Sequence, residues 1–142
     1  MKKSSSSINQ SSAEKTLLNK YKKLIGNTRI KPQRLILDEE NNVYIDLDGY
    51  EEGQYAIEIY AHIGSLKAGQ RKKIATDILK LSLIDVPNKI LIVHNDVKNW
   101  LDKNSWIASA VKKHNIKVES ADYSKTMEEK IRRTQKKQNR TT

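Results

Sequence analysis

Two neighbouring stretches in which apolar and polar residues alternate constrain the fold of this chain most. The first covers residues 43–48 and the second residues 54–62, and a segment rich in Gly and Glu separates them. Strict alternation predicts a strand with one buried face, and two such strands joined by a short turn predict a hairpin. We therefore expect Asp46 or Asp48 to lie near Glu58 on one shared face of this hairpin.

A helix is predicted to follow the hairpin, from Gln70 to about Ile84. Ile74, Ile78 and Leu81 recur at helical spacing and would form its buried stripe. An adjoining stripe is polar. Its members are Gln70, Lys73, Asp77 and Lys80.

The remaining patterns predict an α/β domain with a mixed sheet. An amphipathic helix is expected from residue 13 to about residue 25, a short strand at 34–38, and a hairpin turn at 39–42. The continuous apolar run 89–94 is typical of a strand that is buried on both faces. A second amphipathic helix is expected within 100–114, carried by Trp106, Ile107, Ala110 and Val111, and an edge strand is expected at 116–123. The predicted order is helix, three strands, helix, strand, helix, strand.

The chain of 142 residues is long enough for one domain with tails. Residues 1–12 are rich in Lys, Ser and Asn and are predicted to be a disordered lead-in. The domain itself is expected to span residues 13–123. Residues 124–142 are strongly basic and are predicted to form a C-terminal tail that is helical only near 127–134. This tail is either a phosphate-binding arm or a solvated segment that aids solubility.

Charge and composition narrow the classes of function. Lys and Arg number 27 against 17 acidic residues, a formal net charge of +10, which favours a polyanionic partner such as nucleic acid, although an acidic protein partner fits too. The absence of Cys excludes disulfides, thiolate metal sites and a Cys nucleophile. No apolar run approaches the length of a membrane span, so we expect a soluble, cytoplasmic protein without a membrane partner.

Several familiar catalytic patterns are missing from the sequence. There is no Gly-rich phosphate loop and no G-x-S-x-G elbow. His62, His94 and His114 are too scattered to form a metal triad in one element, and His62, although it shares the strand face of Glu58, is interpreted as an ordinary polar-face residue. Trp100 and Trp106 are interpreted as core or interface anchors.

Two acidic residues on paired strands, followed by a helix with Gln and Lys, resemble the PD-(D/E)XK nuclease superfamily, which has the restriction endonuclease-like fold. The resemblance covers roughly residues 13–123 as an order of elements and residues 48–81 as a motif. Residues 58–81 also resemble a group of small bacterial and phage proteins expected to share this fold. The resemblance implies a mixed sheet in the order α-βββ-α-β-α-β flanked by helices, cleavage of DNA with a divalent metal, and a possible homodimer.

The resemblance assigns roles to particular residues. It implies that Asp48 and Glu58 hold Mg²⁺ or Mn²⁺. Tyr60 stands where the family has Lys, so Lys73 or Lys72 from the following helix would replace it, with Lys73 orienting the attacking water or the phosphate. Gln70 would assist. Glu14 is either a further metal carboxylate or, as we favour, a residue that complements the helix dipole.

The predicted function is metal-dependent hydrolysis of phosphodiester bonds in DNA. The basic residues expected to hold the backbone are Lys67, Arg71, Lys72, Arg132 and Arg133. Tyr60 leaves open an inactive nucleic-acid-binding or anti-defence module on the same fold. A basic protein- or RNA-interaction factor without a metal is a further alternative.

Overall fold

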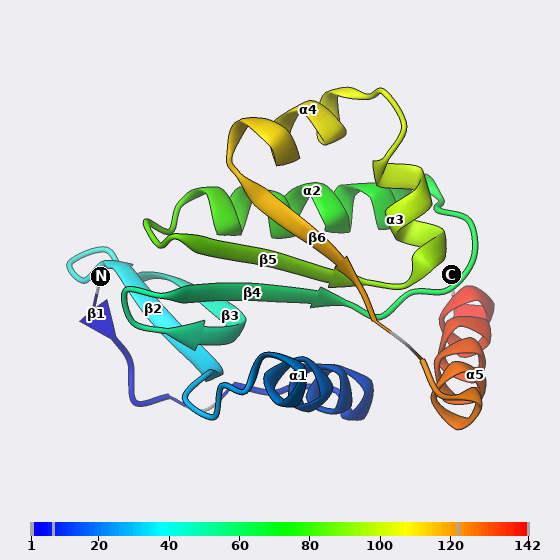
Figure 1. The fold of residues 1–142 in the computed structure, drawn as a ribbon, viewed down its shortest axis with the longest axis horizontal. Coiled ribbons are helices and arrows are strands. Elements are labelled where there is room, and N and C mark those ends of the chain that lie inside the picture. The colour runs from blue at the N-terminus through cyan, green and yellow to red at the C-terminus, as the bar shows by residue number, and fades with distance from the viewer. Residues whose placement is uncertain (1, 7, 122, 142) are drawn as a thin grey trace.

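The computed structural model describes residues 2–6, 8–121 and 123–141; residue 122 of the predicted edge strand and the first and last residues of the predicted tails lie outside this part. Within it, the chain forms a mixed α/β fold in three layers, with a six-stranded sheet between two layers of helices (Figure 1). The strands are β1 (Lys2–Lys3), β2 (Lys31–Asp38), β3 (Val43–Glu51), β4 (Tyr55–Tyr60), β5 (Asn88–Val93) and β6 (Ile116–Ser120). The helices are α1 (Ser12–Ile25), α2 (Ala68–Ser82), α3 (Asn95–Leu101), α4 (Trp106–Lys113) and α5 (Lys125–Thr141).

The sheet order follows the chain order, from β1 to β6. Strands β2, β3 and β4 form the predicted antiparallel meander, whereas β4, β5 and β6 run parallel. Parallel neighbours require crossover connections, and α2 supplies the first while α3 and α4 supply the second. The predicted α/β class and mixed sheet are therefore confirmed.

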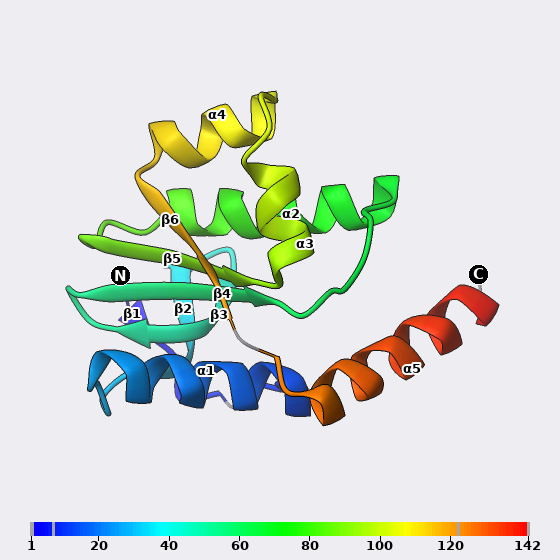
Figure 2. The ribbon, with the colours of Figure 1, turned by 45° about the vertical axis from the view of Figure 1, so that its right-hand side comes forward.

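Apolar residues separate into two core clusters, one on each face of the sheet. Helices α2, α3 and α4 cover one face, and α1 and α5 cover the other (Figures 1 and 2). On β5, Leu91 and Val93 belong to the first cluster and Ile90 and Ile92 to the second. Its uninterrupted apolar run is thus explained by burial on both faces, as predicted.

Local signals fix the ends of α1. The Ser11 hydroxyl accepts a hydrogen bond from the Glu14 N–H at 3.2 Å, and Gly26 ends the helix in the left-handed conformation with φ of 66°. A side-chain N-cap and a left-handed Gly are the ordinary start and stop of a helix. The predicted bounds of α1 therefore agree with the structure to within about a residue at each end.

The structure differs from the sequence predictions at both ends of the chain. Residues 2–3 are not a free lead-in but pair with β2 as β1, and the Gln33 side chain donates a hydrogen bond to the Ser4 carbonyl at 2.8 Å. The basic C-terminal segment forms α5 along its whole described length, and Met127 and Ile131 are buried in the second core cluster. Two buried side chains one helical turn apart are a weak pattern among so many charges, so the docking was not predicted.

The region between β5 and β6 also departs from the prediction. It contains two helices rather than one, because His94 caps a short helix α3 with a hydrogen bond to the Asp96 N–H. Trp106 was expected on the buried stripe of α4, but it is 74% exposed at the first position of that helix. Trp100 packs against the first core cluster, as expected for an anchor.

No helix in residues 2–6, 8–121 and 123–141 combines the length and apolar character needed to cross a membrane.

Gly49 marks the closest approach between β3 and its neighbours. A Cβ placed there would lie 2.9 Å from Ile30 Cγ2 and 3.0 Å from Leu18 Cδ1. We expect Gly49→Ala to lower the free energy of unfolding by about 1–3 kcal/mol through overpacking. Gly69→Ala is the control, because a Cβ there meets no atom within 4 Å and Ala suits a helix better than Gly. Urea denaturation of both variants measures the difference, and equal effects would contradict the packing explanation.

Candidate functional site

A bulge in β3 determines where the carboxyl group of Asp48 lies. Lys31 pairs with Tyr50 and Gln33 with Leu47, so three residue steps of β3 match two of β2. The extra residue changes the phase of the alternation, and Leu47 and Tyr50 consequently both belong to the first core cluster. Bulges of this kind redirect side chains and are common beside functional sites.

Strands β3 and β4 separate at the same point. Their backbone pairing ends with the pair Gly49 and Ile57. Beyond this pair the Asp48 side chain bridges the two strands, because its Oδ2 accepts the Ile59 N–H at 2.8 Å. The Asp48 N–H in turn donates to Glu58 Oε1 at 3.3 Å. The two carboxyl groups predicted to converge are therefore brought together.

Glu58 is an unusual buried acid. Its side chain is only 2% exposed, and among the described residues it forms an ion pair with Lys80, whose Nζ lies 3.0 Å from Oε2. Burial, followed by the charges of Asp48 and Asp77, raises the pKa of Glu58 to about 9, against the opposing effect of Lys80. Glu58 therefore carries a proton at neutral pH unless a cation compensates its charge.

Helix α2 supplies the facing side of the site. Lys73, Asp77 and Lys80 occupy one face, four and then three residues apart, and all three were on the polar stripe recognised in the sequence. Lys73 forms an ion pair with Asp77, which is fully buried, and Asp77 Oδ2 has no hydrogen-bond partner among the described residues. Asp77 and Lys80 had been assigned no role, because their contact with Glu58 depends on how α2 docks on the sheet.

The segment before β2 closes the site from the other side. The Gln10 side chain donates to the Asp48 carbonyl at 3.0 Å and approaches Oδ1 at 3.4 Å. Burial and the charge of Asp48 raise the pKa of Glu14, which places the Glu14 carboxyl group in the field of the same cluster. The dipole interpretation of Glu14 is thus insufficient, since this side chain also faces Asp48.

Other candidates lie apart from this cluster. Asp46, the competing metal ligand, forms two hydrogen bonds with Arg34, at 2.7 and 3.0 Å, and does not join Glu58. His62 is buried, its Nε2 lies 3.1 Å from the Ser65 carbonyl oxygen, and its ring stacks on Tyr60 with 5.5 Å between centroids. Tyr60 is therefore a packing partner of His62 at the position where the resemblance implies a Lys.

The predicted backbone-binding residues fall into two groups. Lys67, Arg71 and Lys72 are exposed around the start of α2, and the Arg71 guanidinium lies 5.8 Å from the centroid of the Trp100 ring. On α5, Arg133 lines a cavity, whereas Arg132 is exposed and is not one of the lining residues. These two arginines could not be distinguished until the docked face of α5 was known.

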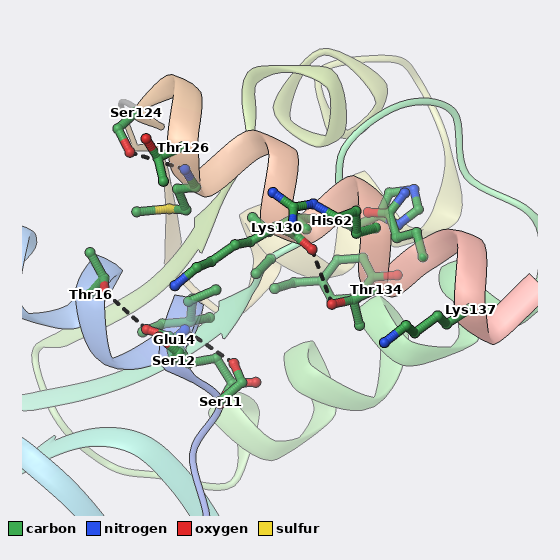
Figure 3. A pocket seen from close by; sticks show the side chains of 18 of the residues that line it. Ser11, Ser12, Glu14, Thr16, His62, Ser124, Thr126, Lys130, Thr134 and Lys137 are labelled. Carbon is green, nitrogen blue, oxygen red and sulfur yellow. Dashed lines mark hydrogen bonds between the residues drawn. The ribbon is translucent and has the colours of Figure 1, made fainter.

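A cavity of about 710 Å³ lies between the N-terminal end of α1, the end of β4, the start of α2 and α5 (Figure 3). Glu14 and Lys73 line it and also interact with the acidic cluster, so the cavity adjoins Asp48 and Glu58. Gln70 lines it as well, and its Oε1 accepts the Lys67 N–H at 2.6 Å. Gln70 thus has a structural role at the start of α2 beside its predicted one.

The donor atoms of this site are all carboxylate oxygens, which suit Mg²⁺ or Mn²⁺. Among the residues that the structure describes, no three His, Cys, Asp or Glu side chains are grouped so as to hold a metal ion together. Mg²⁺ nevertheless needs only one or two carboxylates, because it keeps several waters. Asp48 and Glu58 fit this smaller donor set, and the buried Asp77 Oδ2 has no hydrogen-bond partner within the described part of the chain.

Comparison with known proteins gave no match to a family model, to a curated protein or to a solved structure.

Proposed function

We propose that this protein is a metal-dependent nuclease that hydrolyses phosphodiester bonds in DNA, with a restriction endonuclease-like fold. One observation carries the proposal: where β3 and β4 separate, Glu58 accepts the Asp48 N–H and lies in the field of the Asp48 carboxylate, opposite two lysines of α2. Acidic groups are rarely buried together without a compensating charge. A buried acid with a strongly raised pKa beside a cavity is typical of a functional site.

In this proposal Asp48 and Glu58 hold Mg²⁺ or Mn²⁺. The cation, when bound, supplies Lewis-acid stabilisation of the phosphate and makes water a better nucleophile at neutral pH. Glu58 gives up its proton as the cation binds, since the raised pKa reflects burial and neighbouring carboxylates that a cation neutralises. Lys80 holds the Glu58 side chain in place through its 3.0 Å hydrogen bond.

Lys73 is proposed to bind the reacting phosphate as a cation and not to act as a general base. Burial lowers its pKa, but Asp77, Glu58 and Asp48 outweigh burial, so the pKa is raised and Lys73 stays a cation. Its side chain is 51% exposed and lines the cavity. A fixed cation at this position suits binding of the reacting phosphate. Gln70, with its Oε1 engaged, has its amide nitrogen left to orient the phosphate or the water.

The alternative is a nucleic-acid-binding or anti-defence module on this fold that has lost catalysis. Tyr60 favours it, since no Lys stands at that position, and so do the hydrogen bonds that already engage both oxygens of Glu58. A basic protein- or RNA-interaction factor is the third class, supported by the net charge of +10 alone. A homodimer stays a prediction.

Cleavage assays with plasmid, single-stranded and branched DNA across a Mg²⁺ and Mn²⁺ titration test the proposal. We expect cleavage by the wild-type protein and a loss of at least about 100-fold in Glu58→Ala and Asp48→Asn, because metal ligands contribute several kcal/mol to such reactions. Asp46→Asn is the matched control, since Asp46 is a neighbouring strand carboxylate engaged only with Arg34 among the described residues. This control is expected to keep its activity.

Thermal unfolding with and without Mn²⁺ gives a readout that is independent of catalysis. A cation that binds the folded state raises the melting temperature of the wild-type protein and of Asp46→Asn, but not of Glu58→Ala. DNA binding without any cleavage would support the inactive module. A protein that neither cleaves nor binds DNA would support the third class, the basic protein- or RNA-interaction factor.

A further inference from the structure

The cavity beside the acidic cluster has two unlike walls. Figure 3 shows Lys130 reaching from α5 across the cavity toward Glu14 and Ser12 of α1. Lys130 and Arg133 are exposed, and within the described residues the Lys130 ammonium group has no acidic partner while Arg133 lies 3.9 Å from Glu129 at the surface. The α5 wall therefore presents cations whose charge is hardly compensated.

The lining also offers hydroxyl groups, on the α1 side and near the start of α5. Figure 3 shows Ser11, Ser12 and Thr16 on the α1 side and Ser124 and Thr126 near the start of α5. Hydroxyl and cationic side chains are the common partners of phosphate oxygens in nucleic-acid complexes. The lining thus combines hydroxyl and cationic side chains that suit phosphate oxygens with apolar residues from β4 and α5, and Glu14 supplies its carboxyl group among the described residues.

The position of α5 is held by specific contacts. Gln135 accepts the Ile63 N–H and donates to the Ile63 carbonyl, both at 3.0 Å, and Met127 and Ile131 are buried beneath the helix. An amide that satisfies both polar groups of one residue fixes the helix to the segment that follows β4. The basic wall is therefore a built part of the fold and not a solvated tail.

We propose that this cavity is a cleft that binds one strand of nucleic acid, with Lys130 and Arg133 neutralising phosphates that flank the reacting one. The inference rests on the proposed function, because Glu14 and Lys73 belong both to the cleft and to the acidic cluster. It deepens that function by assigning the class of substrate. Single strands, flaps and strand ends enter this site, and continuous duplex does not.

The dimensions of the cleft exclude an intact duplex. Its volume of about 710 Å³ is that of a pocket for one small ligand and holds a few nucleotides at most. Residues of α1, of the end of β4, of the start of α2 and of α5 line this space together. We expect it to take one backbone, since the second backbone of a duplex would have to lie outside this lining. Single-strand sites in other proteins likewise combine a basic groove with a narrow path.

Fluorescence anisotropy in EDTA tests the proposal without cleavage. The probes are a labelled single strand of about 12 nucleotides, within the usual site size for single strands, and the matching duplex. We expect the wild-type protein to bind the single strand about tenfold more tightly than the duplex. Lys130→Gln combined with Arg133→Gln is expected to weaken single-strand binding about tenfold and to lower the salt slope by about 1.4, or about 0.7 for each lost phosphate contact.

The control removes the same charge from the other side of α5. Lys125→Gln combined with Lys136→Gln changes two exposed residues outside the cleft lining, and we expect less than a twofold effect on affinity. Equal effects of the two pairs, or a preference for duplex, would overturn the cleft. Single-strand binding that depends on Lys130 and Arg133, with no cleavage in Mg²⁺, would support the cleft and refute the nuclease. Far-UV circular dichroism confirms that both variants are folded.

Discussion

Glu58→Gln is expected to unfold at higher urea concentration than the wild-type protein at alkaline pH, although it removes a central residue of the site. The ordinary pKa of a Glu side chain applies in the unfolded chain, whereas in the folded protein the pKa of Glu58 is raised to about 9 by burial and by Asp48 and Asp77. Between these two values the folded state holds a proton that the unfolded state releases. Wild-type stability therefore falls as the pH rises through this window.

Gln at position 58 does not titrate, so this part of the decline disappears in the variant. We expect the two proteins to differ most above pH 9, by on the order of 3 kcal/mol in favour of the variant, since each pKa unit corresponds to about 1.4 kcal/mol and the variant gives up part of this gain by losing the ion pair with Lys80. Urea denaturation in EDTA at several pH values measures the difference. Titration of other groups is common to both proteins and cancels.

Glu52→Gln is the matched control, because Glu52 is an exposed carboxylate whose only described partner is Lys3 at the surface. The free energy of unfolding of this variant is expected to lie within about 0.5 kcal/mol of the wild-type value at every pH. Parallel curves for wild type and Glu58→Gln would show that Glu58 is ionised at neutral pH in the folded protein. The burial of an ionised Glu58 beside Asp48 and Asp77 would then need another explanation.

Ile131→Asn is expected to detach α5 from the sheet. Ile131 is 5% exposed and lies in the second core cluster, so the variant loses apolar burial and places an unpaired amide there. The cost of such a change is about 2–5 kcal/mol. A detached helix of this length is marginal in water, and α5 should therefore lose its helical structure as well as its position.

Hydrogen exchange measures this result locally. Amides of α5 should lose most of their protection, while those of β4 and β5 keep theirs, because the core between the other elements is intact. Lys136→Asn, an exposed position on the same helix, is the control and is expected to preserve protection. Unchanged protection of α5 in Ile131→Asn would mean that the Gln135 contacts with Ile63 suffice to hold the helix.

The prediction of the fold from sequence was accurate where burial follows a local period. The alternation in β4 correctly assigned Ile57 and Ile59 to one face and Glu58 to the other. It failed in β3, where the bulge shifts the phase after Leu47 and separates Asp48 from Asp46. A bulge depends on the partner strand, and the sequence of one strand does not specify it.

The candidate site was only partly predictable for a similar reason. Asp48 and Glu58 are close along the chain and meet through one hairpin, so their proximity followed from the turn between them. Asp77 and Lys80 reach Glu58 only because α2 packs across the sheet at a particular angle and depth. Helical spacing gave their shared face but not the element that this face would meet.

The sequence by itself determined most of the elements and their order, because periodic apolar residues and capping signals act over a few residues, but it did not indicate β1, α3 or the full length of α5. It also determined the excess of positive charge and the pairing of the two strands that carry Asp48 and Glu58. Tertiary structure alone decided that Glu58 is buried beside two other acids, and that α5 docks to form a basic wall. These features depend on burial between segments far apart in the chain, and such burial arises only when the two faces of the sheet are covered.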